Sequence, residues 1–241
     1  MRSLRNYLAL TFSVLLLLGG SISIQAAGLV GHWTFDDLSD STGNFEDIIL
    51  QDATIAGGQL DVGVGMWAVA TNYGGPEIGE VTLVAMLSMD DLSVLAGSAL
   101  TLDQINADSF NGIIFGERQP QRWMNGSSNF SRTDDFDPGF EETETGVMFQ
   151  IAISHEDDGS GTSIVRGYRN GELIGEYTQG PLATWATDDA EVFFGTRHGN
   201  AASGGPGNLD AHIEEAWVYS GVLSGEELSV CPEIKLLFFA S

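Results

Sequence analysis

The stretch HIEEAWVYSGVLSGEEL, residues 212–228, indicates a β-sheet fold, because side chains in its first half alternate as in a β-strand. Successive side chains of a strand point to opposite faces, so Glu215 shares a face with Trp217, whereas Glu214 shares the other with Val218. Whichever face is buried, we expect one glutamate to enter the core with it. We expect a metal ion, an arginine or backbone N–H groups to hold that carboxylate, as an architectural group and not a catalyst.

The second half of this stretch predicts one helical turn. Glu227 follows Ser224 by three residues, the spacing of a capping box, in which the Ser hydroxyl accepts from the Glu amide and the Glu carboxylate reaches back. We therefore expect the last strand, residues 211–219, to be followed by a short helix that closes the domain.

The rest of the chain is also typical of an all-β domain. Its 31 glycines are spread along the sequence and punctuate short runs of apolar and β-branched residues. Residues 81–87, VTLVAML, are apolar on both faces, which indicates a strand covered on both sides. The predicted strands are residues 29–35, 47–55, 80–88, 112–116, 146–154, 162–169, 172–178, 191–196 and 211–219.

Two of these strands are joined by the strongest local signal in the sequence. Asn170-Gly171 supplies the positive φ angles of a two-residue hairpin turn, which sets Arg169 opposite Glu172. In residues 147–154, VMFQIAIS, alternate side chains are apolar, so we expect one face of that strand to be core.

The first 27 residues predict a secretory signal peptide. Arg2 and Arg5 precede an apolar stretch, residues 7–18, that is too short for a membrane span, and the small pair Ala26-Ala27 follows. We expect a mature chain that starts near residue 28, extracellular or periplasmic, with no stable membrane span. The absence of a cysteine near this point argues against a lipid anchor.

The predicted organisation is a signal peptide over residues 1–27, one domain over residues 28–229 and a tail over residues 230–241. Cys231 is the only cysteine, so no internal disulfide can stabilise the domain, and burial of apolar surface has to do so. With 43% hydrophobic residues, a single core of adequate size is expected.

The charge balance excludes one class of partner. The chain has 34 acidic and nine basic residues, which give a formal net charge of −25. Such a surface repels phosphate backbones, so we do not expect a nucleic-acid partner. It also suits water of high ionic strength, where screening weakens self-repulsion, and this predicts a marine or halophilic source.

Several short motifs together resemble one family. They are LVGHWTFDD (29–37), DSTGN (40–44), NGEL (170–173), IEEAWVY (213–219) and LSGEEL (223–228), with GER (116–118), FSRT (130–133) and YRNG (168–171) between them. The chain from residue 29 to residue 228 resembles the bacterial laminin-G-like domains, in the version found in large secreted proteins of planctomycete-type bacteria. These belong to the concanavalin A-like lectin and glucanase superfold. The resemblance implies a two-sheet antiparallel jelly-roll sandwich, one sheet concave, whose first and last strands are neighbours.

The resemblance also implies a structural calcium ion, which in such domains ties the loop after the first strand to the last strand. By position, the ligands would be Asp40, Asn44 and Glu214. The family pattern has aspartate where Glu214 stands, so the side chain here is longer by one methylene. The alternative is that Asp40 and Asn44 only form an Asx-type turn.

A carbohydrate site would need exposed aromatic faces flanked by planar polar groups. Trp123 is the leading candidate, because Arg118, Arg122 and Asn125 surround it in the sequence. The tryptophans Trp67 and Trp185 are further candidates, since they also fall in glycine- or threonine-rich stretches. In the alternative interpretation, Trp123 seals an edge of the sandwich.

Catalytic patterns are weak in this sequence. The glucanases of the superfold carry an E-x-D-x-x-E strand, and the nearest approach here, residues 141–144 (EETE), lacks the aspartate. The histidines have no ligand spacing, and we expect structural or surface roles for them: His32, His155, His198 and His212.

Arginine is so scarce that each should find a carboxylate partner. This expectation covers Arg118, Arg132, Arg169 and Arg197, one of which could neutralise the inward glutamate. The sequence therefore predicts a secreted, non-catalytic module that recognises extracellular carbohydrate or a surface protein. The alternatives are a structural or protein-interaction spacer and, with less support, a glycoside hydrolase.

Overall fold

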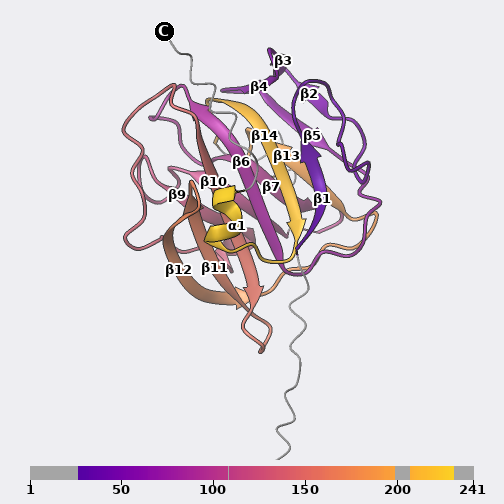
Figure 1. The fold of residues 1–241 in the computed structure, drawn as a ribbon, viewed down its shortest axis with the longest axis vertical. Coiled ribbons are helices and arrows are strands. Elements are labelled where there is room, and N and C mark those ends of the chain that lie inside the picture. Colours follow the sequence, from indigo (N-terminus) through magenta and orange to yellow (C-terminus); the bar gives the residue numbers. More distant parts are fainter. Residues whose placement is uncertain (1–26, 108, 199–206, 231–241) are drawn as a thin grey trace, which may run out of the picture.

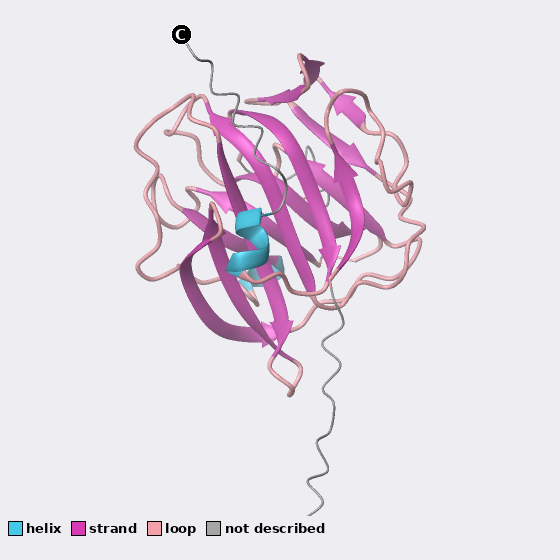
Figure 2. Cartoon of the chain, viewed as in Figure 1, coloured by secondary structure: helices cyan, strands magenta, loops and turns pink. Residues whose placement is uncertain are grey.

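The computed structural model describes residues 27–107, 109–198 and 207–230. The predicted signal peptide and tail fall outside these ranges, except for their innermost residues, 27 and 230. Two antiparallel β-sheets face each other, as predicted, and a short helix lies on the outer surface of one of them (Figures 1 and 2). Among the described residues, no helix is both long and apolar enough to cross a membrane.

The larger sheet has eight strands, and the smaller has six. In the larger sheet the order is β12-β11-β10-β6-β14-β4-β3, with β1 paired to β14; in the smaller it is β2-β5-β13-β7-β8-β9. The larger sheet consists of β1 (Gly28–Trp33), β3 (Thr54–Ala56), β4 (Gln59–Val62), β6 (Val81–Met89), β10 (Phe149–Asp157), β11 (Thr162–Arg169), β12 (Glu172–Pro181) and β14 (Ala211–Ser220). The smaller consists of β2 (Ile49–Gln51), β5 (Trp67–Ala70), β7 (Gly97–Gln104), β8 (Phe110–Phe115), β9 (Trp123–Ser127) and β13 (Ala190–Phe194).

The first and last strands lie side by side, as the resemblance implied. β1 pairs with β14, with His32 opposite Trp217 and Trp33 opposite Ala216 (Figure 1). The start and the end of the domain are therefore held together by one ladder of hydrogen bonds.

The core lies between the two sheets. Trp33 contacts Phe45 and Phe194 there, with ring centroids 5.3 and 5.2 Å apart. Burying one such large apolar side chain stabilises the fold by roughly 1.5–3 kcal/mol. This inter-sheet packing stabilises the domain without a disulfide.

β6 is buried on both faces, which confirms the prediction from its two-sided apolar sequence. Its outer face is covered by the helix α1 (Gly225–Val230), whose Leu228 belongs to a second apolar cluster with Val84 and Trp217. The predicted capping box forms: the Glu227 N–H donates to Ser224 Oγ (3.2 Å), and the Ser224 N–H donates to Glu227 Oε2 (2.8 Å).

The hairpin between β11 and β12 is also confirmed. Arg169 lies opposite Glu172, and the turn residues Asn170 and Gly171 have φ angles of 52° and 78°. The alternation in β10 is confirmed as well, since alternate side chains on one face enter the main core: Phe149, Ile151 and Ile153.

The expectation that a glutamate must enter the core is wrong, because β14 contains a β-bulge. Ile213 lies opposite Leu87 of β6 and Glu215 opposite Met86, so Glu214 is an extra residue in the ladder. The bulge shifts the alternation by one position. Ile213, Ala216 and Val218 therefore face the core, and Glu214 is exposed.

Several predicted boundaries are also wrong. The strand expected over residues 47–55 is two strands in different sheets, β2 and β3, and between them Asp52 has a φ of 56°. The strand expected over residues 191–196 ends at Phe194, because Gly195 takes a φ of 86°. Four strands were not predicted at all: β4, β5, β7 and β9.

Candidate functional site

Trp123 does not offer an exposed aromatic face. It lies in β9, is 1% exposed, and its ring packs against Phe115 and Phe149 in the core. Its indole N–H donates to Glu142 Oε1 (3.0 Å), and Glu142 also forms a two-point ion pair with Arg169 at 2.9 and 3.0 Å. The structure thus supports the alternative interpretation, in which Trp123 closes the sandwich.

The polar residues predicted around Trp123 are engaged within the protein. The guanidinium of Arg122 pairs with Glu141 (3.2 Å) and also donates to the Pro138 carbonyl (2.8 Å). A depression beside Arg122 and Trp123 is too narrow to hold a water molecule. Asn125 is buried and takes part in the polar network described below.

The other two candidate tryptophans differ from each other. Trp185 is fully buried, and its backbone pairs with that of Ile78, so it has no face for a ligand. Trp67 of β5 is half-buried beside Phe193, with ring centroids 5.7 Å apart. Of the three predicted tryptophans, Trp67 alone keeps part of its surface accessible.

The carboxylate of Asp40 organises its own loop. Its Oδ1 accepts from the N–H groups of His32 (2.8 Å) and Thr42 (3.0 Å). Its Oδ2 accepts from the Thr42 hydroxyl (2.6 Å) and from the N–H groups of Asn44 (2.9 Å) and Phe45 (3.0 Å). A carboxylate has about four lone-pair positions, so five donors leave no free position for a metal ion.

The residues predicted to bind calcium therefore do not fit an ion in this geometry. Asn44 turns its amide toward the Val30 carbonyl, to which Nδ2 donates (3.0 Å), and Glu214 projects from the bulge into solvent. The arrangement around Asp40 is an Asx-type turn, the alternative to a calcium site.

Glu215 is held by a histidine and not by an arginine. Its Oε1 lies 2.7 Å from His32 Nε2, and the Ser41 hydroxyl lies 2.7 Å from His32 Nδ1. The imidazole stacks on Trp217, with ring centroids 5.5 Å apart and planes inclined by 11°. Glu215 and its partners thus lie on the outer face of the larger sheet and contribute to its packing.

Carboxylate partners exist for three of the four arginines named from the sequence. Arg169 pairs with Glu142, Arg197 with Glu117, and Arg118 with the adjacent residues Asp134 and Asp135 at 3.3 and 3.4 Å. For Arg132 the expectation is wrong. It is 3% exposed and donates only to neutral oxygens, including Asn111 Oδ1 (2.8 Å) and the Phe110 carbonyl (3.0 Å).

Arg132 belongs to a polar network that spans the space between the sheets. Asn125 Nδ2 donates to the Arg132 carbonyl (2.6 Å), so Asn125 Oδ1 accepts from Nε2 of His155 (3.1 Å). Nδ1 of His155 then accepts from the Ser163 hydroxyl (3.2 Å). Burial and the charge of Arg132 lower the pKa of His155 to about 3, so the imidazole is neutral at physiological pH. Nothing in the sequence around His155 predicts that it joins a buried polar network.

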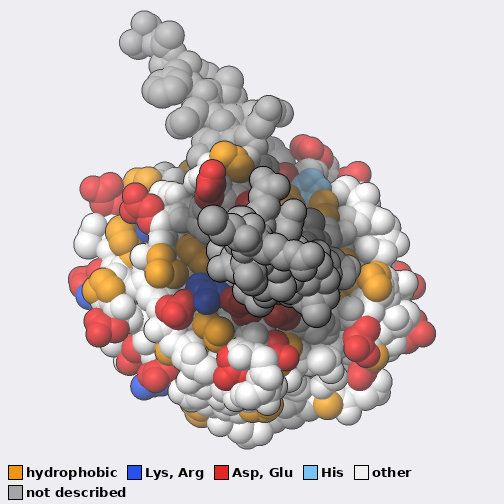
Figure 3. Space-filling view, turned by 60° about the horizontal axis from the view of Figure 1, so that its bottom comes forward, with side chains coloured by type: hydrophobic (Ala, Val, Ile, Leu, Met, Phe, Trp, Pro, Cys, Tyr) orange, Lys and Arg blue, Asp and Glu red, His pale blue; other side chains and the backbone are white. Residues whose placement is uncertain are grey.

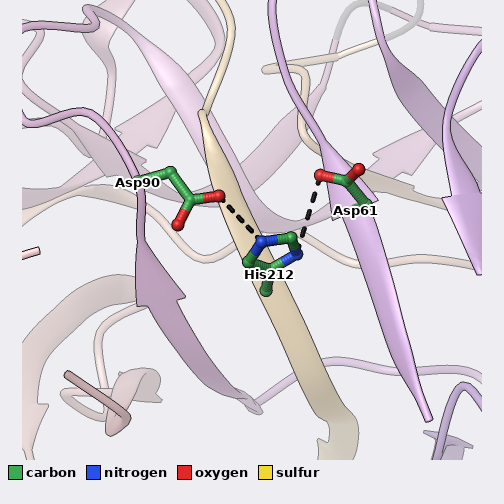
Figure 4. A group of neighbouring side chains, drawn as sticks. All are labelled: Asp61, Asp90 and His212. Atoms are coloured by element: carbon green, nitrogen blue, oxygen red, sulfur yellow. Dashed lines mark ion pairs between the residues drawn. The ribbon is translucent and has the colours of Figure 1, made fainter. Parts of the chain in front are cut away.

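A cluster on the surface of the larger sheet was also not predicted. His212 lies between Asp90 and Asp61 (Figure 4), with Nε2 2.9 Å from Asp90 Oδ2 and Nδ1 3.6 Å from Asp61 Oδ1. Strand register creates it, since Asp61 lies opposite His212 and Asp90 directly follows β6. Burial and the charges of Asp90, Asp91 and Asp61 raise the pKa of the neighbouring Asp210.

The geometry of this cluster suits hydrogen bonding by the imidazole better than a metal centre. Ligand atoms of Asp61, Asp90 and His212 lie within 4.8 Å of one another. However, the two carboxylates face different nitrogens of one ring, whereas a metal would bind through a single nitrogen.

The fold is shared with several solved structures. Domain 4 of an extracellular arabinanase from Geobacillus stearothermophilus, in complex with arabinotriose, aligns with a TM-score of 0.60 and 16% identity over 84% of this chain and 97% of that one. A sialidase from Trypanosoma rangeli aligns with a TM-score of 0.58 and 18% identity, over 86% of this chain but 32% of its own. The binding domain of botulinum neurotoxin serotype D/C aligns with a TM-score of 0.55 and 12% identity, over 84% of this chain and 51% of that one.

At these identities the likeness establishes the β-sandwich fold. No protein-family model matches the chain, and no curated protein sequence does. Sugar-active proteins and the binding domain of a toxin thus share this fold, and the fold alone does not decide between their roles.

Proposed function

We propose that this chain is a secreted, non-catalytic binding module of the laminin-G-like type, and that it recognises extracellular carbohydrate. The observation that carries the proposal is the likeness to a complete arabinanase domain, 97% of which is covered, in a structure that holds arabinotriose. A domain of the same architecture and similar size therefore accompanies a bound sugar in an extracellular arabinanase.

The state of the buried acids supports a non-catalytic role. A glycosidase needs two carboxyl groups about 5 to 9.5 Å apart, free to exchange protons with substrate. Among the residues that the structure describes, the buried carboxylates are Asp40, Asp103 and Glu142, and each has a partner within the protein. Glu142 belongs to residues 141–144, the segment most similar to a glucanase motif, and its carboxylate already accepts from Arg169 and Trp123.

A protein-binding role is the second candidate. The neurotoxin binding domain that shares the fold has also been seen in complex with rat synaptotagmin II, which is a protein. Under this alternative the domain is an interaction module or spacer without a glycan site.

A glycan array at high salt, followed by affinity electrophoresis in gels that contain single polysaccharides, tests the proposal. We expect retardation by at least one polysaccharide without release of reducing sugar. If the protein binds no glycan, the spacer is favoured. If it releases reducing sugar and one carboxylate substitution abolishes this, the non-catalytic proposal is overturned.

A further inference from the structure

The loop that follows β9 holds two consecutive residues in an unfavourable conformation. Asn129 has φ 49° and ψ 27°, and Phe130 has a φ of 55°. Non-glycine residues avoid this left-handed region because the Cβ atom crowds the backbone. A pair of them costs free energy, so the surrounding structure has to hold them in place.

Hydrogen bonds fix this loop, residues 128–133, from two sides. The Arg132 carbonyl accepts from Asn125 Nδ2 (2.6 Å) and from the Tyr177 hydroxyl (2.8 Å). Nε2 of Gln179 donates to the carbonyls of Phe130 (3.2 Å) and Thr133 (3.1 Å). Each of these donors belongs to a strand, so the loop is anchored to both sheets.

Two features beneath the loop tighten this anchoring. The buried guanidinium of Arg132 donates to neutral oxygens on three segments, among them Asn111 Oδ1 and the Ser128 hydroxyl (3.4 Å). Gly180 of β12 lets the loop approach so closely that a Cβ atom there would lie 1.8 Å from the Ser131 carbonyl oxygen. The loop therefore has little freedom to relax.

The side chain that this anchored loop presents to solvent is aromatic. Phe130 is 57% exposed, although aromatic rings normally contribute to stability by being buried. Asn129 beside it is exposed. Gln179, whose side chain donates to the Phe130 carbonyl, is partly exposed. Because the backbone that carries this ring is already fixed, binding a ligand on the ring costs no backbone conformational entropy in the loop.

We propose that Phe130 is the stacking platform of the glycan site, with Asn129 and Gln179 as flanking hydrogen-bonding groups, and that its ligand is a neutral saccharide. This inference rests on the proposed function, for which it supplies the site and the ligand class. A neutral ligand follows from the net charge of −25, which repels anionic sugars.

Affinity electrophoresis tests this site with linear arabinan, xylan and β-1,3-glucan as neutral probes and alginate as the anionic probe. We expect retardation by at least one neutral probe and none by alginate. Phe130→Leu keeps an apolar side chain but loses the aromatic face, and we expect its affinity to fall at least tenfold. Phe130→Trp keeps the face and should bind like the wild type.

Phe140→Leu is the matched control, because Phe140 is the other exposed phenylalanine (38%) among those that the structure describes, and its ring stacks on Arg169. It should bind like the wild type. Thermal unfolding of Phe130→Leu should match that of the wild type, which separates lost binding from lost folding. If wild type and Phe130→Leu bind a glycan equally, or if alginate alone binds, this inference is overturned and the proposed function stands. If the wild type binds no glycan, both are overturned.

Discussion

At the scale of single residues, the neutral imidazole of His155 couples stability to pH. Its pKa is about 3 in the folded protein, against an ordinary value of 6.5. Between these values the unfolded chain binds more protons, so stability is complete above about pH 6.5 and is lost as the pH falls toward 3. The slope approaches about 1.4 kcal/mol per pH unit. Urea unfolding at pH 7, 6 and 5 measures this loss.

His155→Gln is the control for that titration. Glutamine can still donate and accept hydrogen bonds toward Asn125 and Ser163, but it does not titrate. Titration of the carboxylates contributes equally to the pH dependence of stability in both proteins. The variant should therefore lose less stability than the wild type between pH 7 and 5. Parallel pH profiles would show that His155 is not responsible.

Two neighbouring glutamates allow a comparison of buried and exposed ion pairs. Glu142→Gln leaves the partly buried Arg169 without its carboxylate, and we expect the free energy of unfolding to fall by about 3–5 kcal/mol. Glu141→Gln removes the exposed pair with Arg122 and should cost less than about 1 kcal/mol. Urea denaturation of the two variants gives both values; equal costs would mean that Glu142 does not anchor the sandwich edge.

At the scale of elements, the β11–β12 hairpin depends on Gly171 for two reasons. Its φ is 78°, and a Cβ atom would lie 2.8 Å from the Gly225 carbonyl oxygen of α1. Gly159 has a similar φ of 86° but open space around it. Gly159→Ala should therefore lower the free energy of unfolding by about 1–2 kcal/mol, through backbone conformation alone. Gly171→Ala should lower it clearly more, because the added Cβ atom also clashes. Equal losses in urea unfolding would show that the turn does not pack against the helix.

The same elements show what local sequence could predict. The hairpin turn, the capping box and the two-sided strand β6 each follow from residues close together in the chain, and each is confirmed. The hairpin of β3 and β4 was missed although its turn signal is local: Gly57 and Gly58 have φ angles of 64° and 77°, and Ala56 pairs with Gln59. The strand β5 and the bulge at Glu214, by contrast, depend on pairing with distant strands.

At the scale of the whole molecule, the candidate site was the hardest part to predict. The exposure of an aromatic ring depends on the packing of both sheets, which buries Trp123 and Trp185 but leaves Phe130 in solvent. The cluster of His212 with Asp61 and Asp90 likewise exists only through strand register. The net charge, by contrast, follows from the composition alone and can be predicted without the fold.

That charge makes a prediction about salt. Acidic side chains are spread over the face in Figure 3, with few basic ones among them, and the formal net charge is −25. The Debye length falls from about 10 Å at 0.1 M salt to about 3 Å at 1 M, which weakens self-repulsion in the folded state. We therefore expect the melting temperature to rise between these salt concentrations, as in a protein from a marine or halophilic source.

Salt also strengthens the burial of apolar surface, so the electrostatic part needs a matched variant. Glutamine at four exposed positions removes four negative charges without touching an ion pair described above: Glu77, Glu144, Glu214 and Glu226. The apolar contribution is the same in both proteins, because the core is unchanged. The variant should therefore gain less from 1 M NaCl than the wild type. An equal gain, or no gain in either protein, would mean that self-repulsion does not limit stability and would remove the argument for a salt-adapted source.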